Sequence, residues 1–283
     1  MGEVGDDERG VELMKQYTSG TDMLHQCYSF DFLGRKFTAK HFRSKVEGFF
    51  ADGETGWPCW SFSNHDVIRH MTRWAPHSVS PADLSRQAAA LVLTLKGSAG
   101  LYQGEELGLP EADILYDELT DPRGIRFWPE DKGRDGCRTP MPWQRDLPNA
   151  GFTTGKPWLP VKPAQSALSV DVQEADPDST LNAYRTLLAW RKRHPALIAG
   201  DITFFKCDEP VLAYRRSGED KDLICVFNLS AEPRMVKLSK MKPSLEPVSH
   251  NVDLDGTALS LGPNGFAVLS VPVGEGRVSY KAH

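Results

Sequence analysis

Strand-like and helix-like patterns alternate in the first hundred residues, and this alternation constrains the fold more than any other feature. The strand-like segments span residues 23–33, 57–63 and 99–103, and the helix-like segments span 38–50 and 81–96. Thr38 and Ser80 precede the two helices as N-caps. Strands separated by helices form a parallel sheet with crossover connections. Functional residues of such sheets follow the carboxyl ends of the strands.

From about Gly200 the pattern changes to short period-two runs separated by turns, such as VLAYRR and LICVFNLS. These runs predict an antiparallel β module. Before it come a Pro- and Gly-rich excursion at about 110–178, typical of a lid or binding loop, and an amphipathic helix. We therefore predict two domains, 1–199 and 200–283, with the excursion inside the first.

Composition excludes several classes of function. The 283-residue chain has a net charge of −5, whereas nucleic-acid and membrane-surface partners require a basic face. Its five cysteines form no C-x-x-C pair and show no metal-ligand spacing, which is typical of scattered reduced thiols. Membrane-span and signal-peptide patterns are not found in the sequence. We expect a cytoplasmic protein.

Acidic side chains follow three predicted strand ends. Asp66 follows WSFSN after His65, Glu105 and Glu106 follow AGLYQ after Gly104, and Glu3 marks the end of an earlier strand. Two carboxylates that reach one pocket from neighbouring strand ends suit glycosidic-bond cleavage. One protonates the leaving oxygen, and the other offsets positive charge on the sugar ring. A local alternative exists, because Asn64 and Asp66 are also residue types that form strand-to-helix turns.

Four stretches, in family order, resemble motifs of the α-amylase family, glycoside hydrolase family 13. GEVGDD (2–7), SFSNHDVIRH (61–70) and AGLYQGEELGLPE (99–111) are similar to the segments at the fifth, seventh and eighth barrel strands. GRDGCRTPMPW (133–143) is similar to a loop of the α-glucosidase and oligo-1,6-glucosidase branch. The resemblance implies an α/β fold: the C-terminal half of a TIM (β/α)8 barrel, strands five to eight, followed by an antiparallel β-sandwich domain.

The resemblance also implies roles for individual residues. Glu3 matches the general acid/base that donates the proton, and Asp66 matches the residue that stabilises the transition state. His65 matches a ligand of the cleaved sugar, and Arg134 and Arg138 match arginines that line the same subsite. For the two arginines, the alternative is a solvated loop held by local salt bridges. The ion sites of the family lie mostly in a part not present here, so we predict no metal site, and we predict no cofactor.

Other residues near these motifs have more than one interpretation. Glu105 is interpreted as mainly structural, in support of the pocket. Trp60 and Trp128 are interpreted as core or loop packing rather than as sugar platforms. Arg69 and Arg73, one turn apart, either orient carboxylates or face water.

Two segments that the family's retaining α-glucosidases need are not found in this sequence. One carries the nucleophile, an Asp in a G-x-R-x-D context, and the other is a D-x-x-x-N-H motif. A complete barrel takes about 250 residues or more, whereas only about 200 precede the β module here. We therefore expect the first four strands before Met1. We also expect this chain to be inactive and poorly stable without that N-terminal half.

The predicted function is retaining hydrolysis of terminal α-linked glucose in oligosaccharides or disaccharides, with α-1,4 and α-1,6 linkages left open. Within the same family, a transglycosylase of the sucrose isomerase or trehalose synthase type uses the same carboxylates. A non-catalytic scaffold is a different class, but the scaffold members lose the carboxylates and carry a membrane helix. A sugar-binding remnant without turnover is a further alternative.

Overall fold

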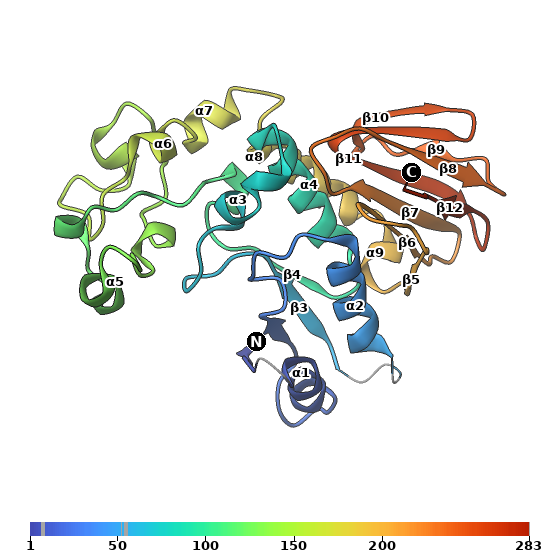
Figure 1. Ribbon diagram of the computed structural model, residues 1–283, viewed down its shortest axis with the longest axis horizontal. Helices are drawn as coiled ribbons and strands as arrows, with labels where there is room; N and C mark the ends of the chain where they lie inside the picture. The colour runs from blue at the N-terminus through green and yellow to red at the C-terminus, as the bar shows by residue number, and fades with distance from the viewer. Residues whose placement is uncertain (7–8, 52, 54–55, 283) are drawn as a thin grey trace.

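The computed structural model describes residues 1–6, 9–51, 53 and 56–282, so Asp7 of GEVGDD lies outside it. Four strands form a parallel sheet in the order β1-β2-β3-β4 (Figure 1). They are β1 (Gly2–Glu3), β2 (Cys27–Ser29), β3 (Pro58–Ser61) and β4 (Ser98–Gly100). Helices α1 (Gly10–Thr18), α2 (Ala39–Phe50) and α4 (Pro81–Thr94) connect them. This arrangement confirms the predicted half barrel.

Two details of the sheet differ from expectation. The strands are shorter than predicted: β2 covers residues 27–29 of the predicted 23–33, and β4 ends at Gly100 and not at residue 103. In addition, the strand ends that carry Glu3 and Asp66 are not adjacent. Strand β2 lies between β1 and β3, and Tyr28 of β2 is in register with Glu3. A residue of β2 therefore separates the two predicted catalytic carboxylates.

The two predicted N-caps are confirmed. The Thr38 hydroxyl accepts the backbone N–H of His41, and the Ser80 hydroxyl accepts that of Asp83, both at 3.2 Å. Helix α4 is buried along nearly its whole length because it contacts β4, α8 (Thr180–Arg191) and strands of the β domain. It is the main element that joins the half barrel to the β domain.

The excursion lies between β4 and α8 and extends away from the rest of the molecule, at the left of Figure 1. It contains only short helices: α5 (Pro122–Phe127), α6 (Pro163–Ser166) and α7 (Val170–Glu174), besides 3-10 turns. Helix α8 begins after Ser179, whose hydroxyl accepts the Asn182 backbone N–H at 3.2 Å. The excursion returns to the barrel there.

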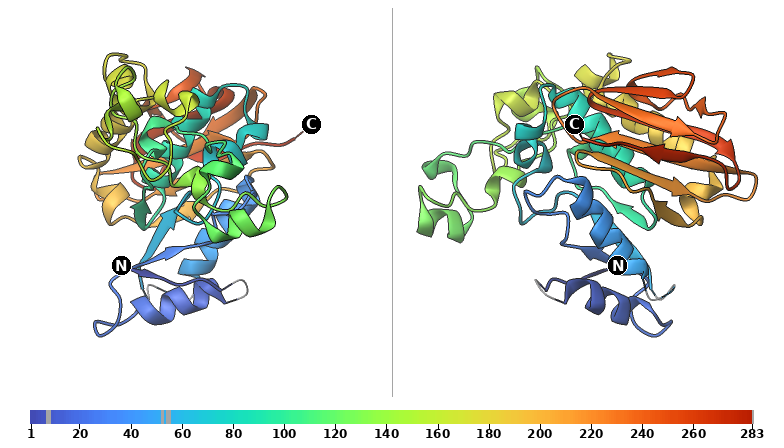
Figure 2. Two further views of the ribbon diagram at one scale, coloured as in Figure 1. Left: turned by 90° about the vertical axis from the view of Figure 1, so that its left-hand side faces the viewer. Right: turned by 45° about the vertical axis from the view of Figure 1, so that its right-hand side comes forward.

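The β domain follows the short helix α9 (Pro195–Ile198), and the proposed boundary near residues 199–200 falls between α9 and β5. Its strands are antiparallel, and Figure 2 shows them packed beside α4 and α8. Their bounds are β5 (Ile202–Phe204), β6 (Val211–Arg216), β7 (Lys221–Asn228), β8 (Arg234–Ser239), β9 (Ser244–Leu245), β10 (His250–Asp255), β11 (Ala258–Pro272) and β12 (Arg277–Ser279). The long strand β11 pairs with β8 and β10 at one end and with β7 and β9 at the other.

Apolar and polar contacts both join the two domains. One continuous core runs from Trp60 of the barrel to Phe227 and Phe266 of the β domain. At the seam, the Glu209 carboxylate accepts the backbone N–H groups of Ala39 and Lys40 at 2.9 and 2.7 Å, which caps α2 from the other domain. None of the described helices combines the length and apolar character needed to cross a bilayer.

Candidate active site

Asp66 lies at the carboxyl end of the parallel sheet, in the loop between β3 and α3 (His70–Arg73). The Asn64 side chain accepts the Asp66 backbone N–H at 2.9 Å, which is the local turn that this residue type favours. The Asp66 carboxylate instead contacts side chains of the distant excursion. The Asn64 side chain therefore forms the local turn, whereas the Asp66 side chain does not.

Two arginines of the excursion bind the same oxygen of Asp66. Arg138 Nη2 donates to Asp66 Oδ1 at 2.7 Å, and Arg134 Nη1 donates to it at 3.2 Å. His65 Nε2 lies 3.5 Å from the other carboxylate oxygen, and Arg138 Nε donates to the His65 carbonyl at 2.6 Å. The structure thus brings four of the five predicted site residues into one cluster. Because the Asp66 side chain is 37% exposed, a ligand can still approach it.

Arg134 is also held from behind by Asp121. Its Nε and Nη2 donate to the two Asp121 oxygens, each at 2.9 Å, and this pairing keeps the pKa of the Asp121 carboxyl well below its usual range. Asp135 in turn accepts the Asp121 backbone N–H at 2.8 Å. Arg134 therefore forms a local salt bridge with Asp121 and contacts Asp66 at the same time. Sequence reasoning missed Asp121, because Asp before Pro122 indicates only the N-cap of α5.

Glu3 is exposed at the end of β1, and Tyr28 stands between it and the Asp66 loop. Tyr28 is in register with Glu3 on the neighbouring strand, and its hydroxyl accepts Asn64 Nδ2 at 3.4 Å. Burial raises the pKa of Tyr28 well above its usual value, and the charges of Glu3 and Asp66 raise it further. Tyr28 therefore stays protonated and can donate a hydrogen bond. The sequence analysis did not identify it, because an aromatic residue in a buried strand indicates packing.

A layer of buried arginines lies beneath the site, and their burial contradicts the interpretation that they face water. Arg69 is 1% exposed, and its guanidinium donates to the backbone carbonyls of Gln103 and Cys137 at 2.6 and 2.9 Å. Arg73 donates to the carbonyls of Phe62, Ile68 and Gly34. Both guanidinium groups bind backbone carbonyls instead of facing water. Arg69 ties the loop after β4 to the excursion, and Arg73 ties the loop after β3 to Gly34 in the segment after β2.

Glu105 is 2% exposed, and within the described part of the chain neither of its carboxylate oxygens has a hydrogen-bond partner. Burial raises its pKa to about 8, so the side chain is largely protonated at neutral pH. His70 Nδ1 lies 3.8 Å away and 3.0 Å from the Ser63 hydroxyl. Burial lowers the pKa of His70 to about 3, and this residue is therefore neutral. Glu105 and His70 form a buried, uncharged support for the Asp66 loop.

The two tryptophans considered above pack against protein. Trp60 is fully buried, and its Nε1 donates to the Lys96 carbonyl at 2.7 Å. Trp128 is half-buried, with Tyr116 at 5.8 Å between ring centroids and the Lys132 ammonium over its ring. Among the described residues, no group of three or more His, Cys, Asp or Glu side chains is arranged to hold a metal ion.

Comparison with known proteins adds independent information. The family described as "Alpha amylase, catalytic domain" matches residues 1–200. A probable alpha-glucosidase of Rhizobium meliloti is 44% identical over 249 residues, which are 88% of this chain and 45% of that protein. An oligo-1,6-glucosidase of Heyndrickxia coagulans is 33% identical over 62% of this chain and 35% of its own length.

The structure resembles solved structures of similar proteins. The alpha-glucosyl transfer enzyme XgtA is 42% identical and superposes with a TM-score of 0.89, over 95% of this chain and 50% of that one. The trehalulose synthase MutB of Pseudomonas mesoacidophila is 25% identical with a TM-score of 0.76, over 92% of this chain and 53% of its own. The chain spans about half the length of the relatives it matches.

Proposed function

Because the chain belongs to the α-amylase family, we propose that it is the part of a retaining α-glucosidase that carries the acid/base and the transition-state stabiliser. Its substrate would be a terminal α-linked glucose of an oligosaccharide or disaccharide. One observation supports this above all: Asp66, at a strand end, is bound by Arg134 and Arg138 from a loop 68 to 72 residues away in sequence. A carboxylate that two guanidinium groups contact in an open site is suited to offset the positive charge that develops on a sugar ring.

In this proposal the two carboxylates have different tasks. Glu3 donates the proton to the leaving oxygen and later takes one from water. Asp66, which contacts two guanidinium groups, stabilises the oxocarbenium-like transition state. Tyr28, which is in register with Glu3 on the neighbouring strand, orients that carboxyl group. His65 and the two arginines provide hydrogen-bond donors for the hydroxyl groups of the glucose.

A retaining mechanism also needs a carboxylate nucleophile, and we assign none to this chain. The matched relatives are about twice as long, and we propose that the nucleophile belongs to a segment of the kind found in their unmatched part. The described sheet leaves room for such a segment: β1 pairs only with β2, and β4 pairs only with β3. Added parallel strands at these two edges would close the barrel.

The test is reconstitution with p-nitrophenyl α-glucoside as the substrate. We expect no turnover from the chain alone, and turnover when it is mixed or co-expressed with the remaining half of the Rhizobium meliloti relative. Glu3→Gln and Asp66→Asn should abolish that turnover, whereas Asp255→Asn, an exposed change in β10, should not. Turnover by the chain alone comparable to that of a full-length relative, or turnover that survives both substitutions, would refute the proposal.

Glucosyl transfer is a second candidate, because a solved structure that is 42% identical to this chain is named as an alpha-glucosyl transfer enzyme. Hydrolysis and transfer share the same carboxylates and differ in whether water or a sugar hydroxyl takes the glucosyl group. Product analysis of the reconstituted enzyme with maltose and with isomaltose separates them. Free glucose as the main product supports hydrolysis, and a new disaccharide or trisaccharide supports transfer.

A further inference from the structure

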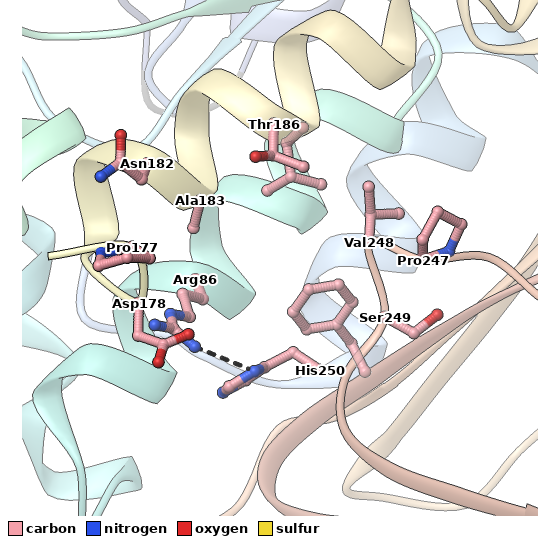
Figure 3. Close-up of a pocket in the computed structure, with 12 residues that line it drawn as sticks. Arg86, Pro177, Asp178, Asn182, Ala183, Thr186, Pro247, Val248, Ser249 and His250 are labelled. Atoms are coloured by element: carbon pink, nitrogen blue, oxygen red, sulfur yellow. Dashed lines mark hydrogen bonds between the residues drawn. The ribbon is translucent and has the colours of Figure 1, made fainter.

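A pocket of about 180 Å³ lies at the seam between the half barrel and the β domain, away from Asp66 (Figure 3). Its walls come from α4, from the start of α8 and from the segment leading into β10. In the view of Figure 3, Arg86 and Asp178 lie on one side, and Pro247 and Val248 lie on the other. The pocket therefore has a charged side and an apolar side.

Arg86 is held in this pocket without a carboxylate partner. Its Nη1 donates to His250 Nδ1 at 3.2 Å, and His250 Nε2 lies 2.6 Å from Asp83 Oδ1. Because a guanidinium can only donate, His250 Nδ1 accepts, and the ring proton sits on Nε2 and is donated to Asp83. The chain from Asp83 through His250 fixes the Arg86 side chain in place. In the described part of the protein, Arg86 forms no ion pair, and its buried Nε has no hydrogen-bond partner.

Opposite charge is present in the same pocket. Asp178, in the turn before α8, is exposed, and no ion pair to its carboxylate is found among the described residues. Thr186 adds a hydroxyl group at the open side, one turn along α8 from Ala183. The pocket thus offers fixed donors from Arg86 and an acceptor from Asp178. The two charges cancel, which favours a neutral ligand with several hydroxyl groups over an anion or a cation.

We propose that this pocket binds a single neutral hexose ring. Adjacent hydroxyl groups of a sugar supply one acceptor for Arg86 and one donor for Asp178, which a simple anion cannot do. The apolar side, formed by Pro247, Val248 and the edge of Phe266, suits the C–H face of the ring. The volume is below the roughly 300–1,000 Å³ of sites for drug-sized ligands, so one ring fits and a longer oligosaccharide does not. The site touches none of the residues around Asp66, and the proposal does not depend on the proposed activity.

The test is a residue-resolved titration of the intact chain with methyl α-glucoside, followed by amide NMR shifts. We expect saturable shifts at Ala183, Thr186 and Ser249 with a Kd on the order of millimolar, since one ring supplies few contacts. Arg86→Met keeps the length of the side chain and should weaken binding about tenfold. The matched control is Arg277→Met, an exposed arginine of β12 that lies outside the pocket; it should leave binding unchanged.

Asp178→Asn is the second variant, because an exposed turn residue can be changed without threatening folding, and it should also weaken binding. Shifts at the pocket are separate from shifts at His65 and Asp66, so a failure of the glucosidase proposal is distinguishable from a failure here. No saturable shift at the pocket, or saturable shifts that survive Arg86→Met, would overturn the inference. Saturation by inorganic phosphate but not by methyl α-glucoside would show an anion site and would overturn it as well.

Discussion

Two carboxylates follow neighbouring strands of the same sheet and end in opposite environments. Asp66, after β3, is exposed and contacts two arginines and a histidine. Glu105, after β4, is buried, lacks a hydrogen-bond partner in the described structure, and has a pKa raised to about 8. The chemistry of a strand-end carboxylate is therefore decided by the surrounding loops and not by its place on the sheet.

The buried arginines explain how the two environments are kept apart. Arg69 donates to the carbonyl of Cys137, the residue next to Arg138, and to that of Gln103. Arg69 thereby holds the excursion against the loop that follows β4. In this position Arg138 contacts Asp66, while Glu105 remains buried. The exposed site around Asp66 depends on the layer of buried arginines. We therefore expect changes at Asp66 to affect turnover and changes at Glu105 to affect stability.

The largest predicted difference is in turnover. In the reconstituted enzyme, Asp66→Asn should lower kcat on the order of 10³-fold, because the proposed mechanism uses the Asp66 charge in the transition state. Glu105→Gln replaces a neutral carboxyl group by a neutral amide of the same shape and should change kcat by less than about tenfold. Steady-state kinetics of both variants measure this contrast. A comparable loss of kcat in both variants would mean that Glu105 also takes part in catalysis, and it would contradict the proposed difference between the two carboxylates.

Next in size is the effect of the buried arginine on stability. Arg69→Met leaves the Gln103 and Cys137 carbonyls without donors, and we expect the free energy of unfolding to fall by about 3 kcal/mol. Urea denaturation measures it, with an unchanged m-value if only stability is affected. Arg185→Met is the control: this arginine is 54% exposed and pairs with Glu174, so we expect a change of no more than about 0.5 kcal/mol. Equal effects of the two changes would contradict the bracing role of Arg69.

Much of the architecture could be predicted from the sequence, because it depends on local patterns. The N-caps Thr38 and Ser80 needed only their own neighbours, and the family motifs named His65, Asp66 and both arginines as one site. The contacts of Tyr28 and Asp121 were not predicted. Their partners lie on other elements of the structure. In the sequence, Tyr28 indicates only strand packing, and Asp121 indicates only a helix N-cap. The burial of Arg69 was missed for the same reason, since its two carbonyl partners are set by how distant loops meet.

The pH dependence of stability gives a smaller effect that isolates Glu105. Its pKa is about 8 in the folded protein, against the ordinary glutamate value of 4.5 in the unfolded chain. The unfolded chain therefore loses this proton first, and stability falls as pH rises between these two values. His70 acts in the opposite direction, because its imidazole in the unfolded chain is still half protonated at pH 6.5, but this small contribution ends by about pH 7.5. Between about pH 6.5 and 8 we therefore expect a loss of about 2 kcal/mol in the wild type.

Glu105→Gln should flatten this pH slope, measured by urea denaturation at each pH. Glu111→Gln is a matched control: burial raises the pKa of Glu111 to about 7, so its contribution ends earlier, and most of the slope above pH 7 should persist. A wild-type slope that is unchanged in Glu105→Gln would show that the carboxyl group is not enclosed as described. In that case Glu105 and Asp66 would differ only in their hydrogen-bond partners, and not in burial.

The smallest expected effect is that of Asp66→Asn on stability. The partners of Asp66 remain satisfied without it, since Arg134 keeps its pair with Asp121 and Arg138 keeps the His65 carbonyl. Exposed ion pairs contribute about 0–1 kcal/mol and weaken with salt. We therefore expect urea denaturation to show a change within about 1 kcal/mol in either direction at moderate salt. A loss above about 2 kcal/mol would mean that Asp66 holds the excursion in place, and a loss of turnover in this variant could then be structural. A small change, together with lost turnover, assigns the charge of Asp66 to catalysis and the layer beneath it to folding.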